Sequence, residues 1–197
     1  MYKLNFKLSL NTYTNINRYA SSLNLPLQTV MRFLLSEQII IFNHNTEIFD
    51  KNYNHCKPKE TMGTIDAYGN EVPPKSYSME VSEFIHDGVE NIQTEYGDKK
   101  EIVVNNLLHI GIAEKLSNFE SIFATPYTDI KPKKKQYSIP LSISFTERLQ
   151  DISKITGIKV NQLISLIIGN YLIEHYAGYD EGVYYNSQSG KYYYDVW

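Results

Sequence analysis

Polar side chains with the chemistry of base recognition alternate along the first ten residues. Lys3, Asn5 and Lys7 share one face of a predicted strand over Lys3–Leu10. The other face of that strand carries Leu4, Phe6, Leu8 and Leu10. In the major groove of DNA, lysine donates to guanine O6 and N7, and asparagine pairs with adenine N6 and N7. The polar face therefore predicts a base-reading surface; the alternative is a solvated strand edge protected by lysine.

A second stretch predicts the same kind of surface near the C-terminal end. Tyr137–Ile143 alternates apolar and polar residues, as a short strand does. Gln136 and Ser138 would point outward from it, and glutamine also reads adenine. Pro140 is a departure, because it has no N–H and removes a ladder hydrogen bond from a ribbon interior.

A further set of residues could bind DNA phosphates, which adds affinity without reading sequence. Pro26 indicates the first turn of a helix, whose outward N–H groups favour an anion. A lysine run precedes the second predicted strand, and for this run the alternative is a solvated basic linker. The predicted phosphate contacts are Gln28, Thr29, Lys133, Lys134, Lys135, Lys159 and Asn161.

The elements that would position these side chains are clearest after residue 143. Ser144 followed by Glu147 has the spacing of a capping box, which predicts that a helix begins there. Gly157 ends that helix, because glycine tolerates the left-handed C-terminal conformation. A second helix follows, with its apolar side formed by Leu163, Ile164, Ile167, Ile168 and Tyr171.

The same pattern of strand, helix, turn and helix recurs three times, which bears directly on the fold. Aligning Gly97 or Asn24 on Gly157 superimposes the apolar positions, and asparagine is second to glycine in the left-handed turn conformation. The predicted segments are Tyr2–Asn43, Ser76–Ser117 and Gln136–Ala177, here named the first, second and third segments. The alternative is three unrelated helical hairpins.

The third segment resembles a ribbon-helix-helix unit of the Arc/MetJ/CopG superfamily of DNA-binding proteins. The resemblance lies in the spacing of Ile139, Leu141, Leu149, Ile152, Gly157, Leu163, Ile164 and Ile167. It implies that strands from two units pair antiparallel and insert outward side chains in the major groove. The expected fold is mainly α with short β-ribbons: three ribbon-helix-helix repeats, with small β-hairpins in the connector and the C-terminal tail.

The predicted domain boundaries follow from these repeats. They are 1–43 for the first unit, 44–75 for a connector, 76–125 for the second unit, 126–177 for the third unit with its basic lead-in, and 178–197 for a tyrosine-rich tail. Glycine and proline punctuate the connector, in which Thr64–Val72 predicts a hairpin. Aromatic runs on both sides of Asn186–Gly190 predict another hairpin in the tail.

Charge differs strongly between the segments, although the whole chain has a net charge of only −3. The first segment has four basic residues and one acidic, which gives +3; the second has three and eight, which gives −5. Residues 131–177 have seven basic and three acidic residues, which gives +4. We therefore expect the first and third segments to pair and face DNA. The second segment, with a structural role, would pair with its copy in a second chain to make a homodimer.

Composition excludes several other classes. The chain has no apolar run near the roughly 18 residues of a membrane span. Its single cysteine fits a reducing, cytoplasmic compartment. No phosphate loop, dinucleotide fingerprint or nucleophile motif is present, so we expect no enzyme and no cofactor. His44, His55 and Cys56 lack the spacing of zinc ligands, so we expect no metal.

The expected function is sequence-specific binding of double-stranded DNA. The resemblance implies a bacterial-type protein associated with the nucleoid or a plasmid. It would be an accessory protein of a conjugative relaxosome or of partition, or a transcriptional repressor. The tail could contact a relaxase or another protein. The alternative is a protein-interaction adaptor that keeps the scaffold without binding DNA, which the acidic second segment and Pro140 favour.

Overall fold

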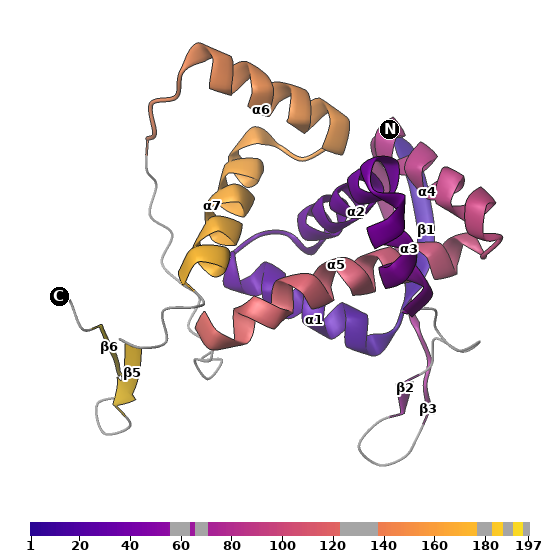
Figure 1. Ribbon diagram of the computed structural model, residues 1–197, viewed down its shortest axis with the longest axis horizontal. Helices are drawn as coiled ribbons and strands as arrows, with labels where there is room; N and C mark the ends of the chain where they lie inside the picture. Colours follow the sequence, from indigo (N-terminus) through magenta and orange to yellow (C-terminus); the bar gives the residue numbers. More distant parts are fainter. Residues whose placement is uncertain (56–63, 66–70, 123–137, 177–182, 187–190, 195–197) are drawn as a thin grey trace.

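In a computed structural model of the chain, the described residues are 1–55, 64–65, 71–122, 138–176, 183–186 and 191–194 (Figure 1). This part is mainly α-helical, with short two-stranded antiparallel sheets. The helices within it are α1 (Leu10–Ser22), α2 (Leu27–His44), α3 (Thr46–His55), α4 (Glu83–Tyr96), α5 (Lys100–Ile122), α6 (Ile143–Thr156) and α7 (Val160–Tyr176).

The longest sheet joins the first and second segments. Strand β1 (Tyr2–Leu8) pairs antiparallel with β4 (Lys75–Val81), and Asn5 lies opposite Ser78 at the middle of the ladder. Alternation decides which side is buried: Leu4, Phe6 and Leu8 are buried, as the period of two predicts, while the polar residues between them are exposed.

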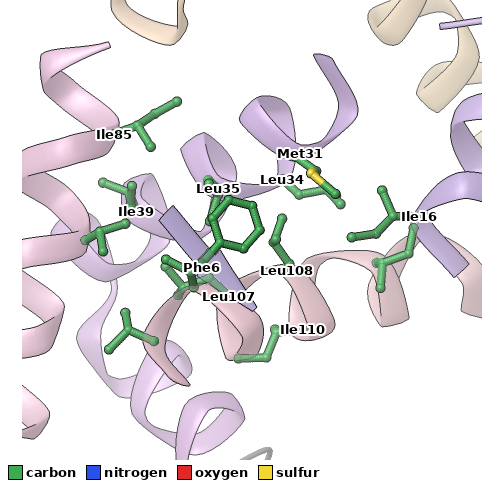
Figure 2. Packing of buried hydrophobic residues seen from close by; sticks show 14 of the residues in the cluster. Phe6, Ile16, Met31, Leu34, Leu35, Ile39, Ile85, Leu107, Leu108 and Ile110 are labelled. Carbon is green, nitrogen blue, oxygen red and sulfur yellow. The ribbon is translucent and has the colours of Figure 1, made fainter. Parts of the chain in front are cut away.

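The helices of both segments cover the apolar side of this ribbon. Phe6 lies among Leu35, Leu107 and Leu108, which come from α2 and α5 (Figure 2). Side chains from β1, α1, α2, α3, β4, α4 and α5 form one continuous buried cluster. Neither segment has a core of its own, so each segment completes the core of the other.

The expected pairing of the first segment with the third is wrong, because β1 pairs with β4 of the second segment. Opposite charge offers a physical reason: segments with charges of +3 and −5 attract, whereas +3 and +4 repel. Lys115 Nζ lies 2.9 Å from Glu37 Oε1, and Lys7 Nζ lies 3.8 Å from Glu101 Oε2. Both ion pairs join the two segments. Strand β4 of the second segment therefore pairs with β1 of the same chain, and not with its copy in a second chain as expected.

Local turn chemistry follows the prediction closely. Asn24, Gly97 and Gly157 have φ values of 52°, 67° and 69°, in the left-handed region proposed for all three turns. The start of α6 differs from the prediction: its N-cap is Ser142, whose hydroxyl accepts from the Phe145 N–H, and not Ser144. Ser9 and Ser82 cap α1 and α4 at the corresponding positions, 133 and 60 residues earlier.

The connector holds a helix that its composition did not predict. Helix α3 inserts Phe49 and Tyr53 into the core, where Tyr53 stacks on Phe49 and its hydroxyl donates to Asp98 Oδ2 at 3.0 Å. Both predicted hairpins have paired strands at the expected places: β2 (Thr64–Ile65) with β3 (Glu71–Val72), and β5 (Val183–Asn186) with β6 (Lys191–Tyr194).

The third segment has its two helices, but residues 138–142 form no strand. Tyr137, the first residue of the predicted strand, lies outside the described residues. Helices α6 and α7 pack at the edge of the body formed by the first two segments (Figure 1). Ile158, Leu163 and Leu166 are buried there against partly buried Leu23, Leu25 and Phe33.

Candidate nucleic-acid interface

The outward face of the β1–β4 ribbon is a continuous polar surface. Register places Lys3 opposite Glu80, Asn5 opposite Ser78 and Lys7 opposite Ser76. All six side chains are exposed, and the ribbon's other face is covered by helices. The structure thus brings the three predicted base readers of the first segment, Lys3, Asn5 and Lys7, together on one ribbon.

The strand paired with β1 is β4, which belongs to the acidic second segment and was expected not to contact DNA. It contributes two hydroxyl groups, from Ser76 and Ser78, and the carboxylate of Glu80. Serine donates to or accepts from several base edges, and glutamate accepts from cytosine N4. The paired ribbon therefore carries donors and acceptors of both kinds, with two lysines against one glutamate.

A shallow hollow lies beside the ribbon, with a volume of about 340 Å³. Lys3, Ser78 and Glu80 of the ribbon line it together with Gln28 and Arg32 of α2. Arg32 Nε donates to the backbone carbonyl of Glu80 at 2.8 Å, which fixes the guanidinium next to the ribbon. The hollow joins a predicted base reader, Lys3, with a predicted phosphate contact, Gln28.

Arg32 is not among the phosphate contacts predicted from the sequence. Its position carried a signal, because Gln28 and Arg32 are four residues apart on α2 and therefore share one helix face. A cation one turn after a predicted phosphate-binding helix start was a reason to include Arg32. Arginine also binds phosphate in a bidentate way that lysine cannot.

The start of α2 is partly occupied within the chain. Thr29 is buried; its hydroxyl donates to Gln162 Oε1 at 3.1 Å, and its N–H donates to the Pro26 carbonyl at 3.0 Å. Gln28 is exposed. Of the two residues predicted here, Gln28 faces the hollow, and Thr29 instead holds α7 against α2.

That contact between Thr29 and Gln162 brings the start of α7 next to the start of α2. Lys159 and Asn161, the phosphate contacts predicted for α7, are both exposed there, and the Lys159 carbonyl accepts from the N–H groups of Gln162 and Leu163. Two helix N-termini with exposed polar side chains are thus neighbours. Positive ends of helix dipoles favour an anion at such a place.

The other predicted residues of the third segment are not brought to this surface. Ser138 is exposed at the start of the described residues 138–142. Gln136, Lys133, Lys134 and Lys135 lie outside the described residues. The predicted base readers of the first and third segments therefore do not share one ribbon among the residues that the structure describes.

The two ends of the ribbon differ in charge. At one end, Lys75 Nζ lies 4.5 Å above the Tyr13 ring, and burial raises the pKa of nearby Tyr77 to about 12. At the other end, Tyr2 stacks on His86 with ring centroids 4.4 Å apart, and the negative charge of Glu83 raises the pKa of Tyr2. The Tyr13 end suits an anion better than the Tyr2 end does.

One cluster of potential metal ligands occurs among the described residues. His86, Asp87 and Glu90 place one ligand atom each within 4.8 Å of one another on the surface of α4. Lys100 Nζ lies 3.0 Å from Glu90 Oε1, so a cation of the chain itself already balances part of this charge. We interpret the cluster as a surface ion-pair network, since exposed pairs of this kind are common.

Comparisons with known proteins returned no similarity: no family model, no curated protein and no solved structure matched this chain. No single helix in the described part is long and apolar enough to cross a membrane, although α1 and α2, bent by 109° between them, pass that test as a pair.

Proposed function

We propose that the protein binds double-stranded DNA through the outward face of the β1–β4 ribbon. The observation that carries the proposal is the exposed row of Lys3, Asn5 and Lys7 on a ribbon whose opposite face is buried. A two-stranded β-ribbon fits the major groove, where these side chain types recognise base edges. The arrangement of strand and two helices in the first two segments agrees with a ribbon-helix-helix unit, in which one chain supplies both halves.

Contacts to phosphate would flank the ribbon. Gln28 and Arg32 line the hollow next to Lys3, and Lys159 and Asn161 lie at the adjacent start of α7. Such contacts set the position of a protein on the duplex, while the ribbon reads the bases. In this proposal the sequence preference comes from Asn5, Lys3 and Lys7, and the affinity comes largely from the cations around them.

The biological setting follows from the resemblance in the sequence. A regulator or accessory protein of plasmid transfer, partition or transcription, located in the bacterial cytoplasm with its DNA, is the setting that we propose. The chain would act by occupying a site and not by catalysis. A relaxase or another protein bound to the tyrosine-rich tail, residues 178–197, belongs to the same proposal.

Selection of bound duplexes from a randomised library tests the proposal, followed by titration of the enriched duplex and a scrambled duplex at two salt concentrations. The triple variant Lys3→Ala/Asn5→Ala/Lys7→Ala should lose the preference for the enriched duplex, by about 10- to 100-fold. Binding by the unaltered chain should weaken as salt rises, because phosphate contacts release counterions.

A matched control removes the same side chain types from other exposed positions. Lys51→Ala/Asn91→Ala/Lys154→Ala deletes two lysines and one asparagine from α3, α4 and α6, outside the ribbon. Its DNA binding should equal that of the unaltered chain. If both triple variants lose binding equally, net charge and not the ribbon is responsible, and the proposed reading surface is wrong.

A second candidate function is that of a protein-interaction adaptor. Two contacts favour it: Glu80 stands opposite Lys3 on the ribbon, and Glu101 pairs with Lys7. Both carboxylates reduce the positive charge that a duplex would meet. Absence of an enriched duplex, with weak binding that does not depend on sequence, would favour the adaptor.

A further inference from the structure

The backbone around the β1–β4 ribbon is close to two-fold symmetric. Equivalent features of the first and second segments lie 73 residues apart: the caps Ser9 and Ser82, the turn residues Asn24 and Gly97, and the helix starts Leu27 and Lys100. Asn5 and Ser78 have the same spacing and lie opposite each other in the ladder. Equivalent positions that face each other are typical of an isologous pair. An approximate two-fold axis therefore passes between Asn5 and Ser78.

The outward side chains of the ribbon do not follow this symmetry. The axis exchanges each residue of β1 with one of β4: Lys3 with Ser76, Asn5 with Ser78, and Lys7 with Glu80. Lysine only donates hydrogen bonds, an ionised glutamate only accepts them, and serine does both. All six side chains are exposed, so packing of the core does not require the difference.

The helix starts beside the ribbon differ in the same way. The axis exchanges Gln28 and Arg32 of α2 with Glu101 and Asn105 of α5. Gln28 and Arg32 line the hollow next to Lys3, so the start of α2 adds a cation to its end of the ribbon. The start of α5 carries a carboxylate at the equivalent place.

That carboxylate contacts one of the predicted base readers. Glu101 Oε2 lies 3.8 Å from Lys7 Nζ, and both side chains are about half exposed. Asn105 is buried, and its Oδ1 accepts from the Ser9 N–H at 3.1 Å. Lys7 therefore contacts DNA in competition with Glu101, whereas Arg32 donates its bond to a neutral backbone carbonyl.

The two ring contacts at the ribbon ends are exchanged pairs as well. Lys75 Nζ lies above the Tyr13 ring at one end, and Tyr2 stacks on His86 at the other. The spacing of 73 residues relates Tyr2 to Lys75 and Tyr13 to His86. Equivalent DNA phosphates would thus meet a lysine at one end and a tyrosine at the other.

We infer that the protein binds an asymmetric, non-palindromic DNA site in one orientation. A palindrome presents the same base edges to the two residues that a two-fold axis exchanges. Lys7 and Glu80 need opposite hydrogen-bonding groups, so no palindrome satisfies both. The preferred duplex offers purine acceptors to β1, and at the Lys3 end it also offers the N4 amine of a cytosine to Glu80. This inference rests on the proposed function and names the class of duplex that the ribbon recognises.

A variant with a symmetric ribbon face tests the inference. Ser76→Lys/Ser78→Asn/Glu80→Lys gives β4 the outward residues of β1. In selections from a randomised library, the unaltered chain should enrich a motif whose halves are not inverted repeats of each other. The variant should enrich one whose central bases are an inverted repeat. Its affinity for the motif of the unaltered chain should fall about tenfold.

A matched control adds the same charge outside the ribbon. Ser21→Lys/Ser144→Asn/Glu147→Lys changes the same residue types at exposed positions of α1 and α6. It should enrich the same asymmetric motif as the unaltered chain. Thermal unfolding of both triple variants checks that the fold is intact.

A single substitution tests the restraint on Lys7. Glu101→Gln gives α5 the residue that α2 has at the exchanged position. It should raise the affinity for the enriched duplex about three- to tenfold at low salt, because it frees Lys7 and removes a negative charge beside DNA. Glu47→Gln, at an exposed position of α3, should change the affinity less than about twofold. Equal affinities for the two variants would overturn the role given to Glu101.

The selections distinguish failure of the inference from failure of the proposed function. An enriched motif that is an inverted repeat about its centre would overturn the inference and leave DNA binding by the ribbon intact. No enriched motif would refute the proposed function, and the inference with it. An asymmetric motif that the symmetric variant selects unchanged would also overturn the inference, because the outward residues of the ribbon would not be its cause.

Discussion

The closed pair of the first two segments and the third segment put the same apolar pattern into opposite environments. Leu34 in α2 is fully buried, whereas its counterpart Ile167 in α7 is 46% exposed. The helices, turns and serine caps are alike in both regions. The difference is the presence of a partner strand and its helices. The helices of the third segment therefore form with only their other side packed against the body, but the apolar face becomes a core only when a second face covers it.

The largest contrast between the two regions should come from truncating equivalent residues. Leu34→Ala should lower the free energy of unfolding by about 3 kcal/mol, because it leaves a cavity in the closed pair. Ile167→Ala should cost less than about 1 kcal/mol in dilute solution, since the side chain is half exposed. Urea unfolding at low protein concentration measures both. Equal losses would show that the third segment is covered even in the isolated chain.

Close helix packing in the closed pair should give the next largest effect. A Cβ atom at Gly88 would lie 2.5 Å from Ile39 Cγ2, so α4 and α2 cannot accept one without movement. Gly88→Ala should therefore destabilise the chain by about 1–3 kcal/mol, despite the better helix propensity of alanine. The counterpart in the third segment is the exposed Arg148, and Arg148→Ala should change stability by less than about 0.5 kcal/mol. Thermal melts of the two variants compare the regions directly.

Removal of the serine caps should produce a smaller difference in stability loss between the two regions. Ser82 is buried and its hydroxyl accepts from the Ile85 N–H, while Ser142 makes the same bond to Phe145 in an exposed place. Ser82→Ala should cost about 1–2 kcal/mol and Ser142→Ala about 0.5–1 kcal/mol, because water replaces the exposed cap more easily. Chemical denaturation followed by circular dichroism provides the measurement. A larger loss for Ser142→Ala would contradict the view that the third segment is the more open region.

The smallest effect should be a pH dependence that belongs to the closed pair alone. Burial lowers the pKa of His109, whose Nδ1 lies 3.3 Å from the Thr12 hydroxyl across α5 and α1. The folded state thus holds fewer protons at this site than the unfolded state. The resulting stability is present above the unfolded pKa of about 6.5 and is lost as pH falls through the folded value.

His109→Gln is the variant that isolates this effect. Its stability should fall less than that of the unaltered chain when pH is lowered from about 7.5 to about 5.5. The counterpart of His109 in the third segment is Gly169, which cannot titrate. Urea unfolding at the two pH values measures the difference; an unchanged pH dependence in the variant would assign the effect to other groups.

Much of the local structure could be predicted because its causes are local. Asn24, Gly97 and Gly157 adopt the turn conformation that their side chains allow, and Leu4, Phe6 and Leu8 are buried as strict alternation requires. Ser9, Ser82 and Ser142 have equal spacing in the three segments, which marks them as caps, although the capping-box spacing of Ser144 and Glu147 predicts Ser144 for α6. Helix α3 escaped prediction because its stability depends on Phe49 and Tyr53 meeting the core of other elements.

The sequence by itself determined the three segments, their turns and the polar face of Lys3, Asn5 and Lys7, since periodicity and turn chemistry act over a few residues. Only the tertiary structure decided that this face pairs with Ser76, Ser78 and Glu80 and that the third segment stays open. Pairing depends on contacts between residues about 70 positions apart, as in the ladder from Asn5 to Ser78. All three segments have similar apolar faces, so the choice of partner depends on differences beyond that shared pattern, such as the opposite net charges of the first and second segments and Pro140 in the third.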